Sequence, residues 1–233
     1  MRAIILAGGF GTRLQTVVSD LPKPMAPIGN KPFLAYLLEY LSRQGITEVI
    51  LSLHYLPERI SDYFFSEYVG IKISYVIEEQ PLGTGGAICY ALQQAQWLVQ
   101  EPVFILNGDT FVTLDYKAMY KNHREKTSKL SIALCEISDC SRYGRATINN
   151  SEIVGFQEKG FAGQGYINAG VYLLSQELFA GYSLPKCFSF EHDFLFKECQ
   201  QLKPQAFFTQ NYFIDIGIPE DYAKACYDLP QII

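Results

Sequence analysis

The sequence predicts an α/β fold in which a mostly parallel sheet is flanked by helices. In the first half, short apolar runs alternate with amphipathic stretches, which is typical of strand–helix units that build such a sheet. In the second half, strand-like runs follow one another with less helix between them, which predicts added strands and a smaller lobe closing over the sheet edge. The chain has 233 residues, 48% of them hydrophobic and 18% charged, so it can bury a sizeable core.

The first-half elements follow from their apolar patterns. Ala3–Ala7 is a short apolar run stopped by glycine, which predicts a buried strand. Pro32–Gln44 predicts a helix, because proline suits its first turn, Gly45 suits its end, and leucines and Phe33 form one stripe. The remaining predictions are strands at Glu48–Leu53, Ile71–Ile77 and Val103–Leu106 and a helix at Thr84–Leu98.

The second half predicts strands at Leu130–Ile137, Arg145–Ile148, Ile153–Gln157 and Ile167–Leu174. No linker or repeat divides the chain, so we treat 1–233 as one domain, with 1–128 as its first half and 129–233 as its second. Right-handed crossovers place the loops after parallel strands along one edge, where open α/β sheets bind ligands.

Composition excludes several classes of function. A net charge of −5 disfavours a broad nucleic-acid surface, which needs clustered Lys and Arg. The six cysteines form no C-x-x-C pair and only three histidines are present, so a zinc site is not expected. No stretch has the length of a secretory signal or a membrane span, and unpaired cysteines favour the cytoplasm.

A glycine-rich segment, LAGGFGTRL at residues 6–14, directly follows the first predicted strand. Three glycines in four positions (Gly8, Gly9, Gly11) let backbone N–H groups approach an anion, and Thr12 and Arg13 add donors. The segment matches neither the Walker A nor the dinucleotide-binding pattern. It predicts a phosphate cradle; a tight strand-to-loop turn is the alternative.

Two further segments supply groups for the same ligand. Lys23 stands between Pro22 and Pro24, and a Lys on a stiffened loop can pre-position charge against phosphoryl oxygens. The segment QPLGTGGA, residues 80–87, can bring glycine backbone near a flat ring, and Thr84 could cap the following helix. A solvated lysine and an ordinary strand-to-helix loop are the alternatives.

Two aspartates are candidates for a magnesium site. Asp109 follows an apolar strand in the segment NGD, and Asp215 lies between Ile214 and Ile216 near a strand end. Magnesium in proteins usually takes one or two carboxylates together with phosphate oxygens and water. Helix capping for Asp109 and a turn before Gly217 for Asp215 are the alternatives.

The second half carries groups suited to a sugar phosphate. Glu158 can bind sugar hydroxyls and Lys159 a phosphate, although a solvated turn would explain both. Asn168 could bridge hydroxyls, but an amide in a buried strand needs some partner in any case.

Taken together, LAGGFGTRL, PKP, QPLGTGGA, NGD, EKG, INAGVY and FIDIGIPEDY resemble the sugar nucleotidyltransferase family, from Met1 to about Tyr222. The resemblance implies a Rossmann-like sheet with an inserted sugar-binding lobe, the nucleotide-diphospho-sugar transferase fold. It implies that Asp109 and Asp215 hold Mg²⁺ and that Arg13, Lys23 and Asp109 are catalytic. The implied nucleotide contacts are Leu6, Ala7, Gly8, Gly9, Gly11, Thr12, Arg13, Lys23, Gln80, Gly85 and Asp109, and the implied sugar-phosphate contacts are Gly144, Glu158, Lys159 and Asn168.

The expected reaction is attack of a sugar 1-phosphate oxygen on the α-phosphorus of an NTP, with release of pyrophosphate. The resemblance favours GTP and D-glycero-α-D-manno-heptose 1-phosphate. Guanylyl transfer to mannose 1-phosphate, uridylyl transfer to N-acetylmuramate 1-phosphate and a catalytically silent nucleotide-binding subunit stay open. Gln80 alone cannot select a base, whereas a carboxylate at Glu78 or Glu79 would favour guanine if it faced the ligand. Gly160 replaces the proline that many relatives carry after the Glu-Lys pair. No nucleic acid or membrane is expected as a partner, and a homodimer is the candidate assembly.

Overall fold

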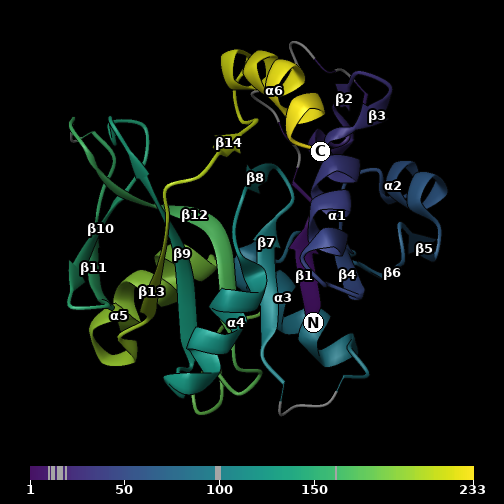
Figure 1. The fold of residues 1–233 in the computed structure, drawn as a ribbon. Helices are drawn as coiled ribbons and strands as arrows, with labels where there is room; N and C mark the ends of the chain where they lie inside the picture. Colours follow the sequence, from purple (N-terminus) through teal and green to yellow (C-terminus); the bar gives the residue numbers. More distant parts are fainter. Residues whose placement is uncertain (10, 12–13, 15–17, 19, 98–100, 161) are drawn as a thin grey trace.

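The first strand, β1 (Arg2–Leu6), lies inside a large sheet and alternates its side chains between two cores (Figure 1). Ala3 and Ile5 pack into one core with helix α1, and Ile4 packs into the other with helix α3. This alternation is the two-residue period of a strand covered on both faces. The computed structural model describes residues 1–9, 11, 14, 18, 20–97, 101–160 and 162–233.

Within this described part, ten strands form one sheet in the order β10-β11-β13-β9-β12-β7-β1-β4-β6-β5. Pairing is parallel across β7, β1, β4 and β6 and between β9 and β13, and antiparallel elsewhere. The strands are β4 (Glu48–Leu53), β5 (Glu67–Tyr68), β6 (Ile71–Ile77), β7 (Val103–Asn107), β9 (Leu130–Ile137), β10 (Arg145–Asn149), β11 (Glu152–Gln157), β12 (Gly165–Leu174) and β13 (Gln205–Thr209). Short pairs are β2 (Pro27–Ile28) with β3 (Lys31–Pro32) and β8 (Thr110–Val112) with β14 (Phe213–Asp215).

Helices cover both faces of the sheet. One core gathers residues of α1 (Phe33–Arg43), α2 (Pro57–Phe64), α4 (Tyr116–Glu125) and α6 (Pro219–Ile232). The other gathers α3 (Gly83–Gln94), the π-helical turn Phe190–Leu195 and α5 (Phe196–Leu202). None of these helices is both long and apolar enough to cross a membrane.

The predicted α1 is confirmed in its essentials. Its N-cap is Pro32, its last turn is followed by Gly45 with a φ of +88°, and the leucine stripe is buried. The helix predicted at Thr84–Leu98 is wrong at both ends. It begins at Gly83 and ends at Gln94, because Ala95 already has an extended backbone. Thr84 does not cap it, because its hydroxyl bonds instead to residues 190 and 191.

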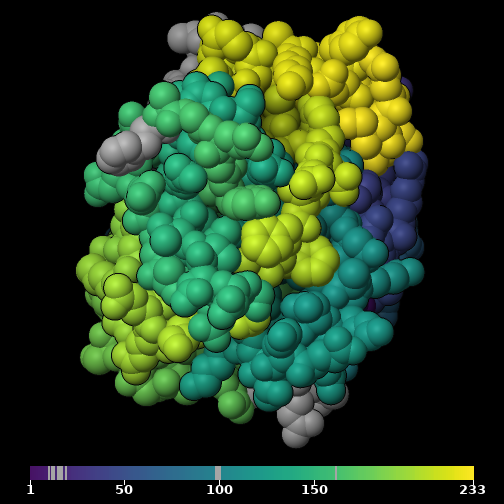
Figure 2. All heavy atoms as spheres, turned by 60° about the vertical axis from the view of Figure 1, so that its left-hand side comes forward, coloured from purple at the N-terminus to yellow at the C-terminus, as the bar shows by residue number. Residues whose placement is uncertain are grey.

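The second half mainly extends the sheet of the first half, and of its described strands only β14 pairs outside that sheet, with β8. β12 pairs antiparallel with β7, and β9 and β13 continue outward to the β10–β11 hairpin. The C-terminal segment then crosses back, and its helix α6, yellow in Figures 1 and 2, lies against the N-terminal part of the chain. The strand pair β8–β14 therefore carries the C-terminal segment to the edge at which β1 and β7 end.

Candidate active site

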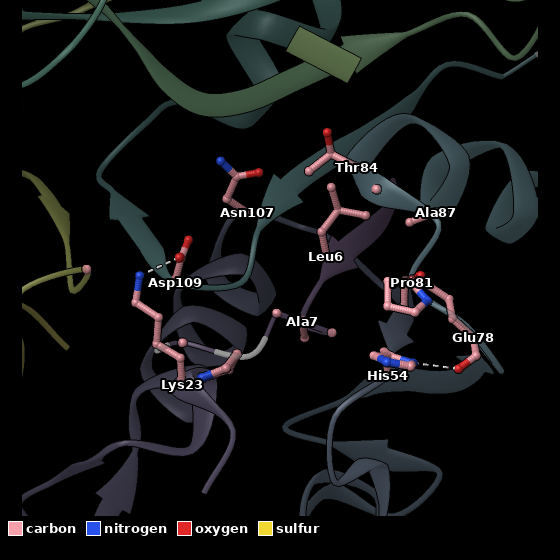
Figure 3. Close-up of a pocket in the computed structure, with 17 residues that line it drawn as sticks. Leu6, Ala7, Lys23, His54, Glu78, Pro81, Thr84, Ala87, Asn107 and Asp109 are labelled. Carbon is pink, nitrogen blue, oxygen red and sulfur yellow. Dashed lines mark hydrogen bonds and ion pairs between the residues drawn. The ribbon is translucent and has the colours of Figure 1, made fainter. Parts of the chain in front are cut away.

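A cavity of about 430 Å³ opens at the carboxyl ends of the central parallel strands. Its walls come from the segments that follow β1, β4, β6 and β7, as expected for a ligand site in an open α/β sheet (Figure 3). The residues lining it are Leu6, Ala7, Gly8, Gly9, Gly11, Lys23, Pro24, Ser52, His54, Glu78, Pro81, Gly83, Thr84, Ala87, Asn107, Asp109 and Gly217.

The glycine segment after β1 forms one wall, and a side chain at Gly8 or Gly11 would collide with neighbouring residues. A Cβ on Gly8 would lie 2.9 Å from the backbone nitrogen of His54. Gly11 has a φ of +60°, and a Cβ there would lie 2.9 Å from the Cβ of Lys23. The cavity thus meets bare backbone, as an anion-binding loop requires. Thr12 and Arg13 lie outside the described residues.

Lys23 reaches two carboxylates at the end of this wall. It begins a 3₁₀ turn, Lys23–Met25, and its side chain is only 9% exposed. Its Nζ donates to Asp109 Oδ2 at 2.5 Å and to Asp215 Oδ1 at 3.3 Å. The surface alternative for Lys23 is therefore wrong, since the ammonium is buried between two acidic groups.

Asp109 and Asp215 come together through the β8–β14 pair. Asp109 immediately precedes β8, Asp215 ends β14 opposite Thr110, and Ile216 N donates to Asp109 O at 3.0 Å. Burial and the neighbouring Asp109 carboxylate raise the pKa of Asp215, and the Lys23 ammonium acts in the opposite direction. The two carboxylates thus crowd each other at a place where positive charge relieves the repulsion.

This arrangement fits a magnesium ion. Both carboxylates are about one-third exposed and reach the same ammonium group, so a cation between them would also meet a ligand in the cavity. Two carboxylates with open positions for phosphate oxygens and water make up the donor set that Mg²⁺ prefers.

A buried carboxylate lies at the other end of the cavity, after β6. Glu78 is 8% exposed and lines the cavity, whereas Glu79 is exposed. Glu78 Oε1 accepts from Ser52 Oγ and Oε2 from Leu82 N, both at 3.0 Å. His54 Nδ1 lies 2.8 Å from the Glu78 carbonyl oxygen. The carboxylate is held in one orientation and keeps lone pairs for further donors.

The segment QPLGTGGA is placed differently from the prediction. Gln80 is exposed and does not line the cavity, and Gly85 is buried beneath residues 186–190. Gly85 N donates to Phe188 O at 2.9 Å, and a Cβ on Gly85 would lie 2.1 Å from the Phe188 ring. The glycines here admit another segment of the protein, and the cavity wall is formed by Gly83, Thr84 and Ala87.

The predicted sugar-phosphate residues meet at one end of β10, β11 and β12. Arg145, the first residue of β10, pairs with Gln157 of β11 and with Ile167 of β12. Gly144 directly precedes Arg145, Glu158 directly follows Gln157, and Asn168 directly follows Ile167, so each predicted residue is next to one of these paired positions. Glu158 and Lys159 are exposed, and Asn168 is half-buried and bonded to Tyr172.

Sequence reasoning missed the contributions of Ser52, His54 and Thr84 to the cavity wall. Ser52 and His54 lie at the carboxyl end of the predicted strand Glu48–Leu53, so a polar residue at a strand end was the available signal. Thr84 was interpreted as a helix cap. The Thr84 hydroxyl is held by the hydrogen bond that it donates to Glu191, and no local sequence pattern connects these two residues.

The chain is similar to known nucleotidyl transferases over nearly its whole length. Residues 2–232 match the family described as nucleotidyl transferase. The chain is 48% identical over 233 residues to D-glycero-alpha-D-manno-heptose 1-phosphate guanylyltransferase of Aneurinibacillus thermoaerophilus, with 100% of both chains covered. It is 48% identical over 223 residues to the protein of that name from Campylobacter jejuni, with 95% and 97% covered.

Solved structures agree with the fold. HddC from Yersinia pseudotuberculosis superposes with a TM-score of 0.86 at 44% identity, covering 97% of each chain. The same protein complexed with GMP-PN gives a TM-score of 0.84 at 43% identity, again with 97% of each chain covered. A putative glucose-1-phosphate thymidylyltransferase from Bacillus anthracis shares the fold at 18% identity, with a TM-score of 0.83 and 97% and 94% covered. The predicted α/β fold of the nucleotide-diphospho-sugar transferase type is thereby confirmed.

Proposed function

Because the chain belongs to the nucleotidyl transferase family, we propose that it transfers a guanylyl group from GTP to D-glycero-α-D-manno-heptose 1-phosphate, giving GDP-heptose and pyrophosphate. The observation that carries the proposal is the placement of Lys23, Asp109 and Asp215 at one end of the cavity and a buried Glu78 at the other. The full-length similarity to two heptose 1-phosphate guanylyltransferases supports the choice of sugar.

The phosphates of the nucleotide would lie along the glycine segment. Backbone N–H groups of Gly8, Gly9 and Gly11 would supply donors, and Lys23 would supply positive charge where the pyrophosphate departs. Arg13 belongs to the same segment in sequence and is proposed as a second cation. Phosphoryl-type transfer depends chiefly on positioning and charge stabilisation, so these groups account for most of the chemistry.

Asp109 and Asp215 would hold Mg²⁺. When bound, the ion neutralises phosphate oxygens of the nucleotide and helps to align the reacting groups. The two carboxylates also fix the Lys23 ammonium at 2.5 and 3.3 Å. Lys23 thus stays directed towards the phosphate end of the cavity.

The sugar phosphate would enter from the β10–β12 side. We propose that Glu158, Gly144 and Asn168 bind sugar hydroxyls and that Lys159 offsets the repulsion between two anionic substrates. A phosphate oxygen of the sugar 1-phosphate would then attack the α-phosphorus of the nucleotide, in line with the departing pyrophosphate. No enzyme nucleophile is required in this scheme.

Guanine would be selected at Glu78. Its carboxylate has four acceptor positions and uses two of them for Ser52 and Leu82. Guanine offers N1–H beside a 2-amino group, a donor pair that pyrimidines lack. A buried carboxylate left without its donors carries a desolvation cost, which is how a hydrogen-bonding site rejects a near analogue.

The proposed place of action is the cytoplasm, supported by six cysteines that are all unpaired.

The proposal is tested by initial rates of pyrophosphate release. GTP, UTP, CTP, dTTP and ATP are each paired with heptose, mannose, glucose and N-acetylmuramate 1-phosphates in the presence of Mg²⁺. GTP with the heptose should give the highest kcat/KM. A maximum at another pair would move the chain to the corresponding sibling activity, and no release with any pair would indicate a silent nucleotide-binding subunit.

A further inference from the structure

A chain of hydrogen bonds begins on the proposed sugar strand at Asn168. Its Oδ1 accepts from Gly170 N at 3.0 Å, and its Nδ2 donates to Tyr172 Oη at 2.8 Å. Gly170 has a φ of +69° and lies at an irregularity of β12. Since a backbone N–H can only donate, the amide oxygen must face Gly170 and the amide nitrogen must face Tyr172.

The Tyr172 hydroxyl continues the chain in one direction only. The residue is 1% exposed, and Tyr172 Oη donates to Glu191 Oε1 at 2.9 Å. Its oxygen accepts from the Asn168 amide, so its proton has to point towards the carboxylate. Burial, together with the Glu191 charge, raises the pKa of Tyr172 well above 10, so the hydroxyl keeps this proton.

The other oxygen of Glu191 binds Thr84, which belongs to the nucleotide wall of the cavity, the part formed by Gly83, Thr84 and Ala87. Thr84 Oγ1 donates to Glu191 Oε2 at 2.8 Å and accepts from Phe190 N at 2.8 Å. Thr84 lines the cavity in the first turn of α3 (Figure 3). Backbone bonds from Gly85 N to Phe188 O and from Phe188 N to Leu82 O fasten the two segments further.

We propose that Glu191 is a positioning residue that couples the nucleotide subsite to the sugar-phosphate subsite. Its carboxylate accepts the Thr84 hydroxyl from the cavity wall and the Tyr172 hydroxyl from the sugar strand, and the neighbouring Ser189 hydroxyl also donates to it at 3.4 Å. The inference rests on the proposed function, because it takes Asn168 to contact the sugar. Ordering of Thr84 by a bound nucleotide then also orders Asn168, and by linkage the sugar phosphate favours nucleotide binding to the same degree.

The coupling depends on a group that accepts on both sides. A glutamine at position 191 has one acceptor oxygen and one donor amide, so it can accept from only one of the two hydroxyls. If Tyr172 keeps donating to that oxygen, Thr84 must turn its proton away and accept from the amide. Glu191→Gln therefore replaces a charge-assisted bond on the Thr84 side by a weaker, reversed one while keeping the side-chain volume.

The test measures affinity for the best sugar 1-phosphate of the rate panel, without and with saturating guanosine 5′-(α,β-imido)triphosphate, whose α–β bridge resists the transfer, or the corresponding analogue of the preferred base. The bound analogue should tighten sugar-phosphate binding in the wild type by about 5-fold or more. In Glu191→Gln, Thr84→Val and Tyr172→Phe this factor should fall towards 1. Thr84→Val should also raise KM for the sugar phosphate, although Thr84 lies on the nucleotide wall.

Tyr116→Phe is the matched control. Tyr116 is fully buried, and its hydroxyl has no partner among the described atoms, so the variant loses a buried hydroxyl outside the chain and should keep the wild-type factor. Circular dichroism and Tm check that each variant is folded. If Glu191→Gln does not fold, Thr84→Val replaces it in the test. An unchanged factor in the variants, or no coupling in the wild type, overturns the inference. Absence of product from every substrate pair in the wild type is instead the failure of the proposed function.

Discussion

Asp109 and Asp215 approach one ammonium group from two different strands. The aspartates are far apart in sequence, and both bond to Lys23. In the proposed chemistry each carboxylate has two tasks, to hold a cation and to orient Lys23. Neutralising either carboxylate should therefore impair the reaction directly.

Asp109→Asn and Asp215→Asn should each lower kcat by about 100-fold or more, since the loss of one preorganised charge-stabilising group has a cost of this size. Both asparagines keep the side-chain volume, so circular dichroism should stay native. The measurement is kcat with saturating substrates and Mg²⁺. Near-normal turnover of either variant would remove that residue from the proposed site.

Glu78 gives a prediction about the base. Glu78→Gln should lower kcat/KM for GTP by about 10-fold relative to the value for UTP, because an amide no longer accepts two donors from guanine. The ratio of the two nucleotides is the informative quantity, since it cancels any loss from the bonds to Ser52 and Leu82. An unchanged ratio would place base selection elsewhere.

The glycines in the first turn of α3 admit another segment of the chain. A Cβ on Gly83 would lie 2.5 Å from Phe188 O, and one on Gly86 would lie 2.4 Å from Lys186 O. The sequence predicts a glycine-rich loop facing a ligand, whereas these glycines lie in the first turn of α3 and face residues 186–188. A run of glycines shows only that side chains must be absent. The atoms that fill the space beside these glycines belong to residues 186–188, about 100 positions away in the sequence.

Gly85→Ala should lower the free energy of unfolding by about 1–3 kcal/mol, the usual cost of overpacking, because the new methyl would overlap the Phe188 ring. Unfolding in urea measures this. Gly155→Ala is the matched control. No atom lies within 4 Å of its added Cβ and its φ is ordinary, so stability should change little. Equal losses in both variants would contradict the packing role of Gly85.

Helix α4 carries a buried histidine against β9. His123 is 2% exposed, and its Nδ1 lies 2.8 Å from Ser131 Oγ. Burial, and secondarily Arg124, lowers the pKa of His123 from 6.5 to about 4. Between these values the unfolded chain binds a proton that the folded chain does not. Stability is therefore full above pH 6.5 and is lost as the pH falls towards 4.

Lowering the pH from 7 to 5 should remove about 2 kcal/mol of stability through His123. The comparison is urea unfolding of the wild type and His123→Asn, which does not titrate, at both pH values. The wild type should lose more stability than the variant over this interval. Equal pH dependence of the two proteins would show that His123 titrates normally in the fold.

At the scale of the whole molecule, the parallel half of the sheet could be predicted and the assembly of the site could not. Strands Glu48–Leu53 and Ile71–Ile77 have their predicted bounds, because apolar runs bounded by polar or glycine residues mark buried strands. β8 and β14 have only three residues each, too few to show a pattern. Yet this pair brings Asp215 to Asp109, and the bond from Thr84 to Glu191 likewise spans 107 residues.

A ³¹P NMR time course of the protein with GTP, D-glycero-α-D-manno-heptose 1-phosphate and Mg²⁺ observes the proposed transfer itself. Equimolar GDP-heptose and pyrophosphate should form, with both substrate signals falling together and no product when Asp215→Asn replaces the wild type. Release of inorganic phosphate or GDP without a sugar nucleotide, or unchanged substrates under conditions in which the wild type is folded, would contradict it.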